Sequence, residues 1–174
     1  MTSNRALHAQ IASILPSLRR FAFSLTTAMA DADDLVQQTV ERLLTRPIPS
    51  DVELLKWAFR VCRNLWIDEY RARKVRANAV FDTELQEAQE FDGARDIEQQ
   101  IELSAVGTAM RTLPEDQHTI LTLVAVQGMS YREVAETLEI PIGTVMSRLA
   151  RARAALASQL YGAAGNDQAE GILQ

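Results

Sequence analysis

Cysteine, glycine and proline are scarce in this sequence of 174 residues, and each scarcity excludes a class of protein. The single cysteine, Cys62, excludes an internal disulfide and a cysteine-rich metal site, and it fits a reducing compartment. With only seven glycines and five prolines, the chain is rich in helix-forming residues. It also lacks the alternating runs between turn residues that are typical of β-hairpins. These scarcities favour an all-α protein.

Long apolar runs are missing too. No stretch approaches the roughly 18 apolar residues that a membrane helix requires, and the first residues lack the apolar core of a signal peptide. We therefore expect a cytoplasmic protein that does not insert into membranes.

Groups with catalytic or metal-binding patterns are not apparent. The sequence contains no recognisable carboxylate pair, Cys/His pair, phosphate-binding loop or metal cluster, so we expect neither an enzyme nor a cofactor or metal site. His8 and His118 are isolated in the sequence and are interpreted as exposed or structural histidines rather than ligands.

The charges are unevenly distributed, although the formal net charge is -5. Basic residues cluster at 60–76 and again at 148–153, whereas the stretch 78–97 is acidic. The negative total argues weakly against nucleic-acid binding, but the local clusters argue for it. We interpret the acidic stretch as a flexible linker that joins two small helical domains and can compete for their basic surfaces.

Apolar residues recur at helical spacing in the first half. They predict helices over residues 13–26, 31–45 and 51–74, and the proline-containing segment 46–50 separates the last two because proline cannot continue a helix. The core side of the second helix is predicted to contain Val36, Val40, Leu43 and Leu44. The third helix is predicted to bury Leu54, Ala58, Val61, Cys62 and Leu65.

The second half begins with two predicted helices. One starts near residue 97, and another starts at Pro114 and ends at Gly128. The core side of this second one is predicted to contain Ile120, Leu121, Val124 and Ala125. The predicted domains are residues 1–77 and 98–163, with the linker at 78–97 and a disordered tail at 164–174.

The sharpest local pattern follows Gly128. Ser130 and Glu133 form a capping box, in which each side chain satisfies a free backbone donor of the other residue. A short helix, a break at residues 139–141 and a third helix over 141–160 complete a helix-turn-helix pattern. Glu139 stands in the turn where glycine is frequent, so we expect slight strain there.

Two helix faces carry side chains suited to nucleic acids. The outer face of the last helix combines short polar groups with arginines, which can read base edges and grip phosphates in a major groove. Its members are Thr144, Met146, Ser147, Arg148 and Arg151. A solvated face of an ordinary helical bundle is the alternative interpretation.

The long helix of the first half has an exposed arc besides its core stripe. An aromatic, an amide and arginines on one arc suit single-stranded DNA, whose bases stack on the aromatic ring. The arc contains Trp57, Arg60, Asn64, Asp68 and Arg71, with Ile67 beside them. Alternatively, Trp57 and Trp66 simply cap the core, which we favour for Trp66. Cys62 is interpreted as an inert small hydrophobe.

Five segments resemble the extracytoplasmic-function sigma factors, in order and over residues 15–160. The segments DDLVQQTVER at 33–42 and LKWAFRVCRNLWIDEYR at 55–71 are similar to the core-binding and −10 regions of this family. The segments LPEDQ at 113–117, GMSYREVA at 128–135 and IPIGTVMSRLARAR at 140–153 are similar to its −35 region.

The resemblance implies partners and site residues. Core RNA polymerase would be contacted at the β′ clamp helices and the β flap, the clamp helices facing Asp34, Gln37, Gln38 and Glu41. The opened −10 element would meet the loop 46–52 and the arc Trp57, Arg60, Asn64, Asp68 and Arg71. The −35 element would meet Thr144, Met146, Ser147, Arg148 and Arg151, although Met146 departs from the Lys or Arg frequent in the family. An anti-sigma factor and a role in stress response are further implications.

Two other functions stay open. A sigma-like adaptor or decoy would bind an anti-sigma protein without programming polymerase, but such domains are usually fused to a receiver domain, for which this chain has no room. A helix-turn-helix transcriptional regulator would leave the segments 33–42 and 55–71 unexplained.

Overall fold

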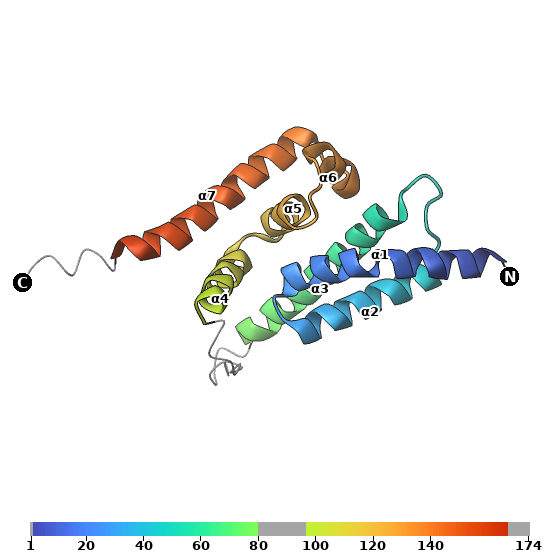
Figure 1. Ribbon diagram of the computed structural model, residues 1–174, viewed down its shortest axis with the longest axis horizontal. Coiled ribbons are helices and arrows are strands. Elements are labelled where there is room, and N and C mark those ends of the chain that lie inside the picture. The colour runs from blue at the N-terminus through green and yellow to red at the C-terminus, as the bar shows by residue number, and fades with distance from the viewer. Residues whose placement is uncertain (1, 80–96, 167–174) are drawn as a thin grey trace, which may run out of the picture.

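Seven α-helices make up the described part of the chain, residues 2–79 and 97–166 of a computed structural model (Figure 1). The first half contains α1 (Thr2–Thr26), α2 (Met29–Thr45) and α3 (Leu54–Ala79). The second half contains α4 (Ile97–Thr112), α5 (Glu115–Ala125), α6 (Tyr131–Leu138) and α7 (Ile142–Asn166). No strand occurs in these two ranges, and the predicted all-α class is confirmed. Within the same ranges, no helix is long and apolar enough to cross a membrane.

The three helices of the first half pack side by side as a bundle (Figure 1). The α2 helix ends at Thr45, directly before the proline-containing segment, as predicted. The α1 helix begins near the N-terminus rather than at residue 13 and continues through Pro16. The turns of α1 before residue 13 precede the apolar residues on which the prediction of this helix was based.

Aromatic packing fixes the centre of this bundle. The rings of Phe21 in α1 and Phe59 in α3 lie 4.8 Å apart at a tilted angle, and both side chains are buried. Cys62 follows Phe59 by three residues on α3 and is fully buried, and burial raises the pKa of its thiol to about 12. The interpretation of Cys62 as a core residue, and that of Trp66 as a core cap, are confirmed.

Three predictions about burial are wrong. Ile67 is buried rather than lying on the exposed arc, because its side of α3 faces the other helices. Leu44 is 43% exposed although it was predicted to face the core. Ala125 is exposed, because it occupies the last turn of α5.

Local signals define the second half. Ser130 accepts from the backbone N–H of Glu133, and the Glu133 carboxylate accepts from that of Ser130, so the predicted capping box is confirmed. Gly128 has φ 68°, in the left-handed region that glycine adopts at no steric cost. Glu139 also lies there, with φ 53° and ψ 47°. The α7 helix runs to Asn166, so the first residues of the expected tail are helical, and 167–174 lie outside the described residues.

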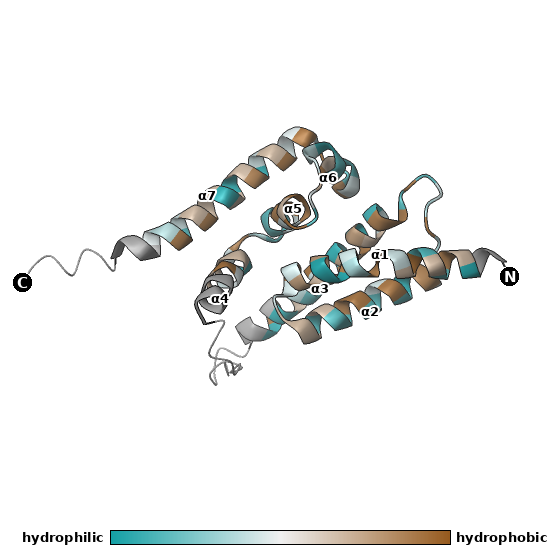
Figure 2. Cartoon of the chain, viewed as in Figure 1, coloured by the Kyte–Doolittle hydropathy of each residue, from teal (hydrophilic) through white to brown (hydrophobic). Residues whose placement is uncertain are grey.

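The two halves pack against each other and share one continuous group of buried residues. Figure 2 shows both hydrophilic and hydrophobic residues along α5, and this helix contacts both α7 and α1. His118 of α5 is 1% exposed, and its Nε2 lies 2.8 Å from the backbone carbonyl oxygen of Ser24 in α1. Its ring stands edge-on to Trp66, with centroids 5.2 Å apart. The predicted linker falls mostly outside the described residues, but the halves it joins form a closed pair.

Candidate nucleic-acid interfaces

The outer face of α2 presents the four side chains predicted to contact polymerase. Residues Asp34, Gln37, Gln38 and Glu41 are all exposed. The opposite face of the helix is buried by Ala32, Leu35, Val36, Thr39 and Leu43. Because buried apolar residues hold α2 against the bundle, the polar face keeps a fixed orientation toward solvent.

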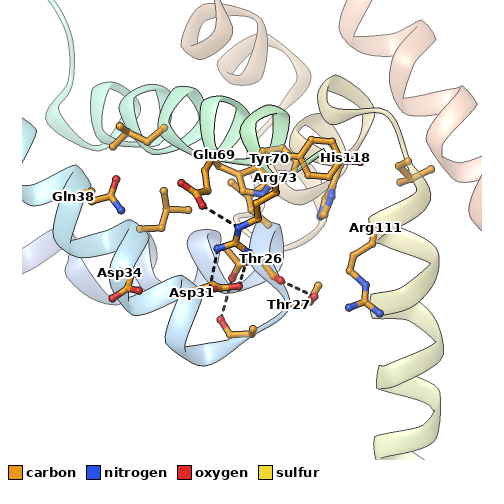
Figure 3. Close-up of a pocket in the computed structure, with 16 residues that line it drawn as sticks. Thr26, Thr27, Asp31, Asp34, Gln38, Glu69, Tyr70, Arg73, Arg111 and His118 are labelled. Carbon is orange, nitrogen blue, oxygen red and sulfur yellow. Dashed lines mark hydrogen bonds and ion pairs between the residues drawn. The ribbon is translucent and has the colours of Figure 1, made fainter. Parts of the chain in front are cut away.

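A cavity of about 690 Å³ lies next to this face and extends between the two halves (Figure 3). Asp34 and Gln38 line it on one side, and Arg111 and His118 line it on the other. Its lining also includes apolar side chains, namely Leu25, Leu35, Leu65, Trp66 and Leu113. The cavity can therefore receive apolar side chains of a partner beside polar groups.

An arginine bridges two elements at the edge of this cavity. Arg73 of α3 bonds to Asp31 of α2 at 3.0 Å and to Glu69 at 3.0 Å (Figure 3). The hydrogen bond to Arg73 lowers the pKa of the Asp31 carboxyl, and the carboxylates raise the pKa of the arginine. This bridge holds the start of α2 against α3.

The predicted arc on α3 is present as one side of that helix. Trp57 is half-buried, and the guanidinium carbon of Arg60 lies 5.4 Å from its ring centroid, a cation–π contact. Asn64, Asp68 and Arg71 follow along the helix and are exposed. We refer to Trp57, Arg60, Asn64, Asp68 and Arg71 as the α3 arc.

Carboxylates of the second half cover this side of α3. We call Glu115, Asp116, Glu136 and Glu139 the acidic cover. Four ion pairs join α3 to it: Lys56 with Glu136 at 3.2 Å, Arg60 with Glu139, Arg63 with Asp116, and Arg71 with Glu115 at 3.1 Å. The bond to Glu115 raises the pKa of Arg71. Sequence reasoning found the basic cluster at 60–76, which includes Arg63, but not Lys56 or the acidic cover.

The five side chains predicted on the last helix occupy one region of α7. Met146, Ser147 and Arg151 are exposed, whereas Thr144 and Arg148 are half-buried. Ser147 Oγ donates to the backbone oxygen of Thr144 at 3.1 Å. The buried side of the same helix, with Val145 at 0% exposure, anchors it against α5 and α6.

Arg148 is already engaged within the chain. Its guanidinium lies 2.8 Å from a carboxylate oxygen of Asp116, which also binds Arg63 of α3. One carboxylate therefore connects α7 with the α3 surface.

In the ranges 2–79 and 97–166, no three His, Cys, Asp or Glu side chains are grouped to hold a metal ion. Burial lowers the pKa of His118, so its imidazole is held neutral as a packing group.

Comparisons with known proteins match both halves. The family description "Sigma-70, region 4" matches residues 103–156, and "Sigma2 domain of PhyR" matches residues 11–61. The chain is 34% identical over 166 residues to the ECF RNA polymerase sigma factor EcfG of Rhodopseudomonas palustris, covering 90% of this chain and 86% of that one.

Two solved complexes share the fold. The sigma factor RpoE in complex with the anti-sigma factor NepR, from Bartonella quintana, matches with TM-score 0.68 and 28% identity over 90% of this chain and 98% of that one. CnrH in complex with the cytosolic domain of CnrY matches with TM-score 0.64 and 27% identity, covering 91% and 89%.

Proposed function

This chain belongs to the extracytoplasmic-function RNA polymerase sigma factors, and we propose how its two halves divide promoter recognition. It binds core RNA polymerase and directs promoter-specific transcription initiation. In the proposed division, residues 1–77 contact polymerase and the −10 element, whereas residues 98–163 read the −35 element.

The observation that carries the −35 assignment is the geometry of α6 and α7. The capping box starts α6, the left-handed residue at 139 turns the chain, and the buried side of α7 locks the second helix in place. The side chains left outward near the start of α7 are Met146, Ser147 and Arg151. A helix presented in this way fits a major groove, where arginine bonds guanine and a thioether can pack on a thymine methyl.

The α3 arc supports a role at the opened −10 element. Single strands are bound by aromatic side chains on which bases stack and by arginines that follow the backbone. Trp57 with Arg60 over its ring supplies both groups at one end of the arc. Asn64 adds an exposed amide that can bond a base edge.

The α2 face and the adjoining cavity support two protein contacts. The exposed carboxylates and amides of α2 suit the β′ clamp helices of polymerase, and the second half is proposed to contact the β flap. Both solved relatives are complexes, one of them named as a sigma factor with its anti-sigma factor. We therefore infer an anti-sigma partner for this chain. Because Asp34 and Gln38 line the 690 Å³ cavity, a partner seated there would also cover the polymerase surface.

A second candidate function is favoured by one observation. The match of residues 11–61 to a sigma2 domain of PhyR is compatible with an adaptor that binds an anti-sigma protein without programming polymerase. The match of residues 103–156 to region 4, and the arginines on both DNA faces, support the sigma factor instead.

Transcription in vitro distinguishes the two functions. Purified chain is combined with core polymerase and a promoter library, and the selected transcripts are sequenced. A sigma factor yields transcripts whose templates share one −10 and one −35 sequence. An adaptor yields none above core polymerase alone, and that result would refute the proposed function.

A further inference from the structure

We propose that the second half shuts the −10 surface of the free chain, and that the carboxylate of Glu139 is the group that closes it onto Arg60. This inference rests on the proposed role of the α3 arc and adds a regulatory contact to it. The covering group is part of the helix-turn-helix itself, so no second protein is needed for closure.

The backbone at Glu139 is the first observation. Its φ of 53° and ψ of 47° are left-handed, a conformation in which a side chain costs roughly 1–2 kcal/mol. Its backbone N–H bonds to carbonyls of Ala135 and Glu136, as any residue could do at the end of α6. The helix end therefore needs the conformation but not the glutamate side chain, and glycine would satisfy it without strain.

The second observation is the ion pair that the Glu139 side chain forms with the other half. Its partner is Arg60, a residue of α3 that is 79 positions away in sequence. The Arg60 side chain is only 24% exposed and lies over the Trp57 ring. The carboxylate thus engages the cation at the point where the proposed single strand would stack.

The third observation is a cavity next to this ion pair, which is lined by both halves. A space of about 310 Å³ is lined by Lys56, Trp57 and Arg60 of α3 and by Glu136, Thr137 and Glu139 of the second half. Lys56 bonds Glu136 at 3.2 Å in this wall. Glu136, Thr137 and Glu139 therefore lie across this space from Trp57, where the proposed DNA strand would bind.

The ion pairs between the acidic cover and α3 follow one another along the helix, and the phosphates of a bound strand would meet the same cations. Arginine and lysine bind carboxylates and phosphates through the same charge-assisted hydrogen bonds. Carboxylates of the acidic cover meet α3 at Lys56, Arg60, Arg63 and Arg71. The cover occupies the cations that a strand would neutralise, so strand binding and closure exclude each other.

Asp116 couples the two DNA surfaces. It binds Arg63 of α3 and Arg148 of α7 together, and separation of the halves breaks the first of these bonds. A chain opened by polymerase therefore exposes the α3 arc and leaves Asp116 paired with Arg148 alone.

The test measures binding of a short, fluorescein-labelled single-stranded DNA of random sequence to the free, full-length chain at low salt. Glu139→Gln removes the charge and keeps a side chain at the left-handed position, whereas Glu139→Gly removes both. Asp33→Asn is the matched control, because it removes one negative charge at Arg19, on α1, instead of at α3. Circular dichroism verifies that all variants are folded.

Both Glu139 variants are expected to bind the strand about two- to fivefold more tightly than Asp33→Asn, the range that an exposed ion pair provides. Equal binding by all three variants would overturn the proposal, since Glu139 would then act only as a helix end. Transcription by holoenzyme separates this outcome from failure of the proposed function. Wild-type holoenzyme should initiate transcription there, whereas a wild-type chain that does not initiate refutes the sigma role and leaves the binding result intact.

Discussion

His118 of the second half is buried at its contact with the first half. It is buried between the Ser24 carbonyl and the Trp66 ring, and its burial depends on closure of the two halves. Burial lowers the pKa of the imidazole, and the bond to Ser24 opposes that shift only in part. The groups that line the adjoining cavity include Asp31, Asp34, Glu69, Tyr70, Arg73 and Arg111.

We expect acidification to weaken the closed, folded chain through His118. In the unfolded chain a histidine titrates near pH 6.5, so below that pH the unfolded state takes up a proton that the buried imidazole resists. The contribution of the neutral His118 to the free energy of unfolding is therefore fully present above the pKa of the unfolded state. It falls as the pH drops toward the lowered pKa of the folded state. Thermal unfolding followed from about pH 7.5 to about pH 5.5 measures this loss. The variant His118→Gln, which keeps a donor for Ser24, should lose part of the dependence, and parallel curves would contradict the assignment.

The α6 helix is short, so its stability depends on its start. The capping box satisfies backbone donors at both Ser130 and Glu133. Replacing Ser130 by Ala is expected to cost about 1 kcal/mol and to weaken −35 binding by holoenzyme, because α6 supports α7. Ser158→Ala, at an exposed position of α7, is the control and should change neither. Chemical denaturation and binding to −35 duplex DNA are the measurements, and equal stability of the two variants would count against the capping role.

The α2 helix carries the proposed polymerase contact. Asp34→Lys and Glu41→Lys should each weaken the complex with core polymerase while the fold stays intact, since both side chains are exposed. Asp51→Lys, an exposed charge reversal outside α2, is the control for net charge. Affinity is measured by fluorescence anisotropy of labelled chain titrated with core polymerase. If the α2 variants bind as tightly as the control, the proposed surface is elsewhere.

Elements with local signals were predictable from the sequence, and contacts between the halves were not. The proline stop after α2, the capping box and the turn at Glu139 each depend on a few neighbouring residues. The Lys56–Glu136 pair joins residues 80 positions apart, and no local pattern distinguishes such a carboxylate from a solvated one. Ile67 was misplaced for a related reason, because a residue at the edge of a helical stripe is buried or exposed according to its neighbours in space.

The whole molecule is a closed pair in which carboxylates of the second half engage the proposed −10 surface and Arg148 of the proposed −35 surface. We therefore expect the free chain to bind −35 duplex DNA poorly and the holoenzyme to bind it well. Anisotropy with labelled duplex compares the two states. Tight, sequence-specific binding by the isolated full-length chain would contradict closure as a barrier.

In the proposed division, α3 acts on opened single strands and α7 acts on duplex DNA within one assembly. Permanganate reactivity of thymines in the −10 region, on linear templates and on templates with a pre-opened bubble, distinguishes the two roles. Replacing Arg151 by Ala should cost about 1–3 kcal/mol in −35 binding if the guanidinium makes a bidentate base contact. A bubble does not restore that contact, because the −35 element stays double-stranded.

Trp57→Ala and Asn64→Ala should instead form a closed complex and open linear DNA poorly, since their partners are unstacked bases. We predict that the bubble template restores holoenzyme function for Trp57→Ala and Asn64→Ala but not for Arg151→Ala. Equal restoration of all three variants, or of none, would contradict it.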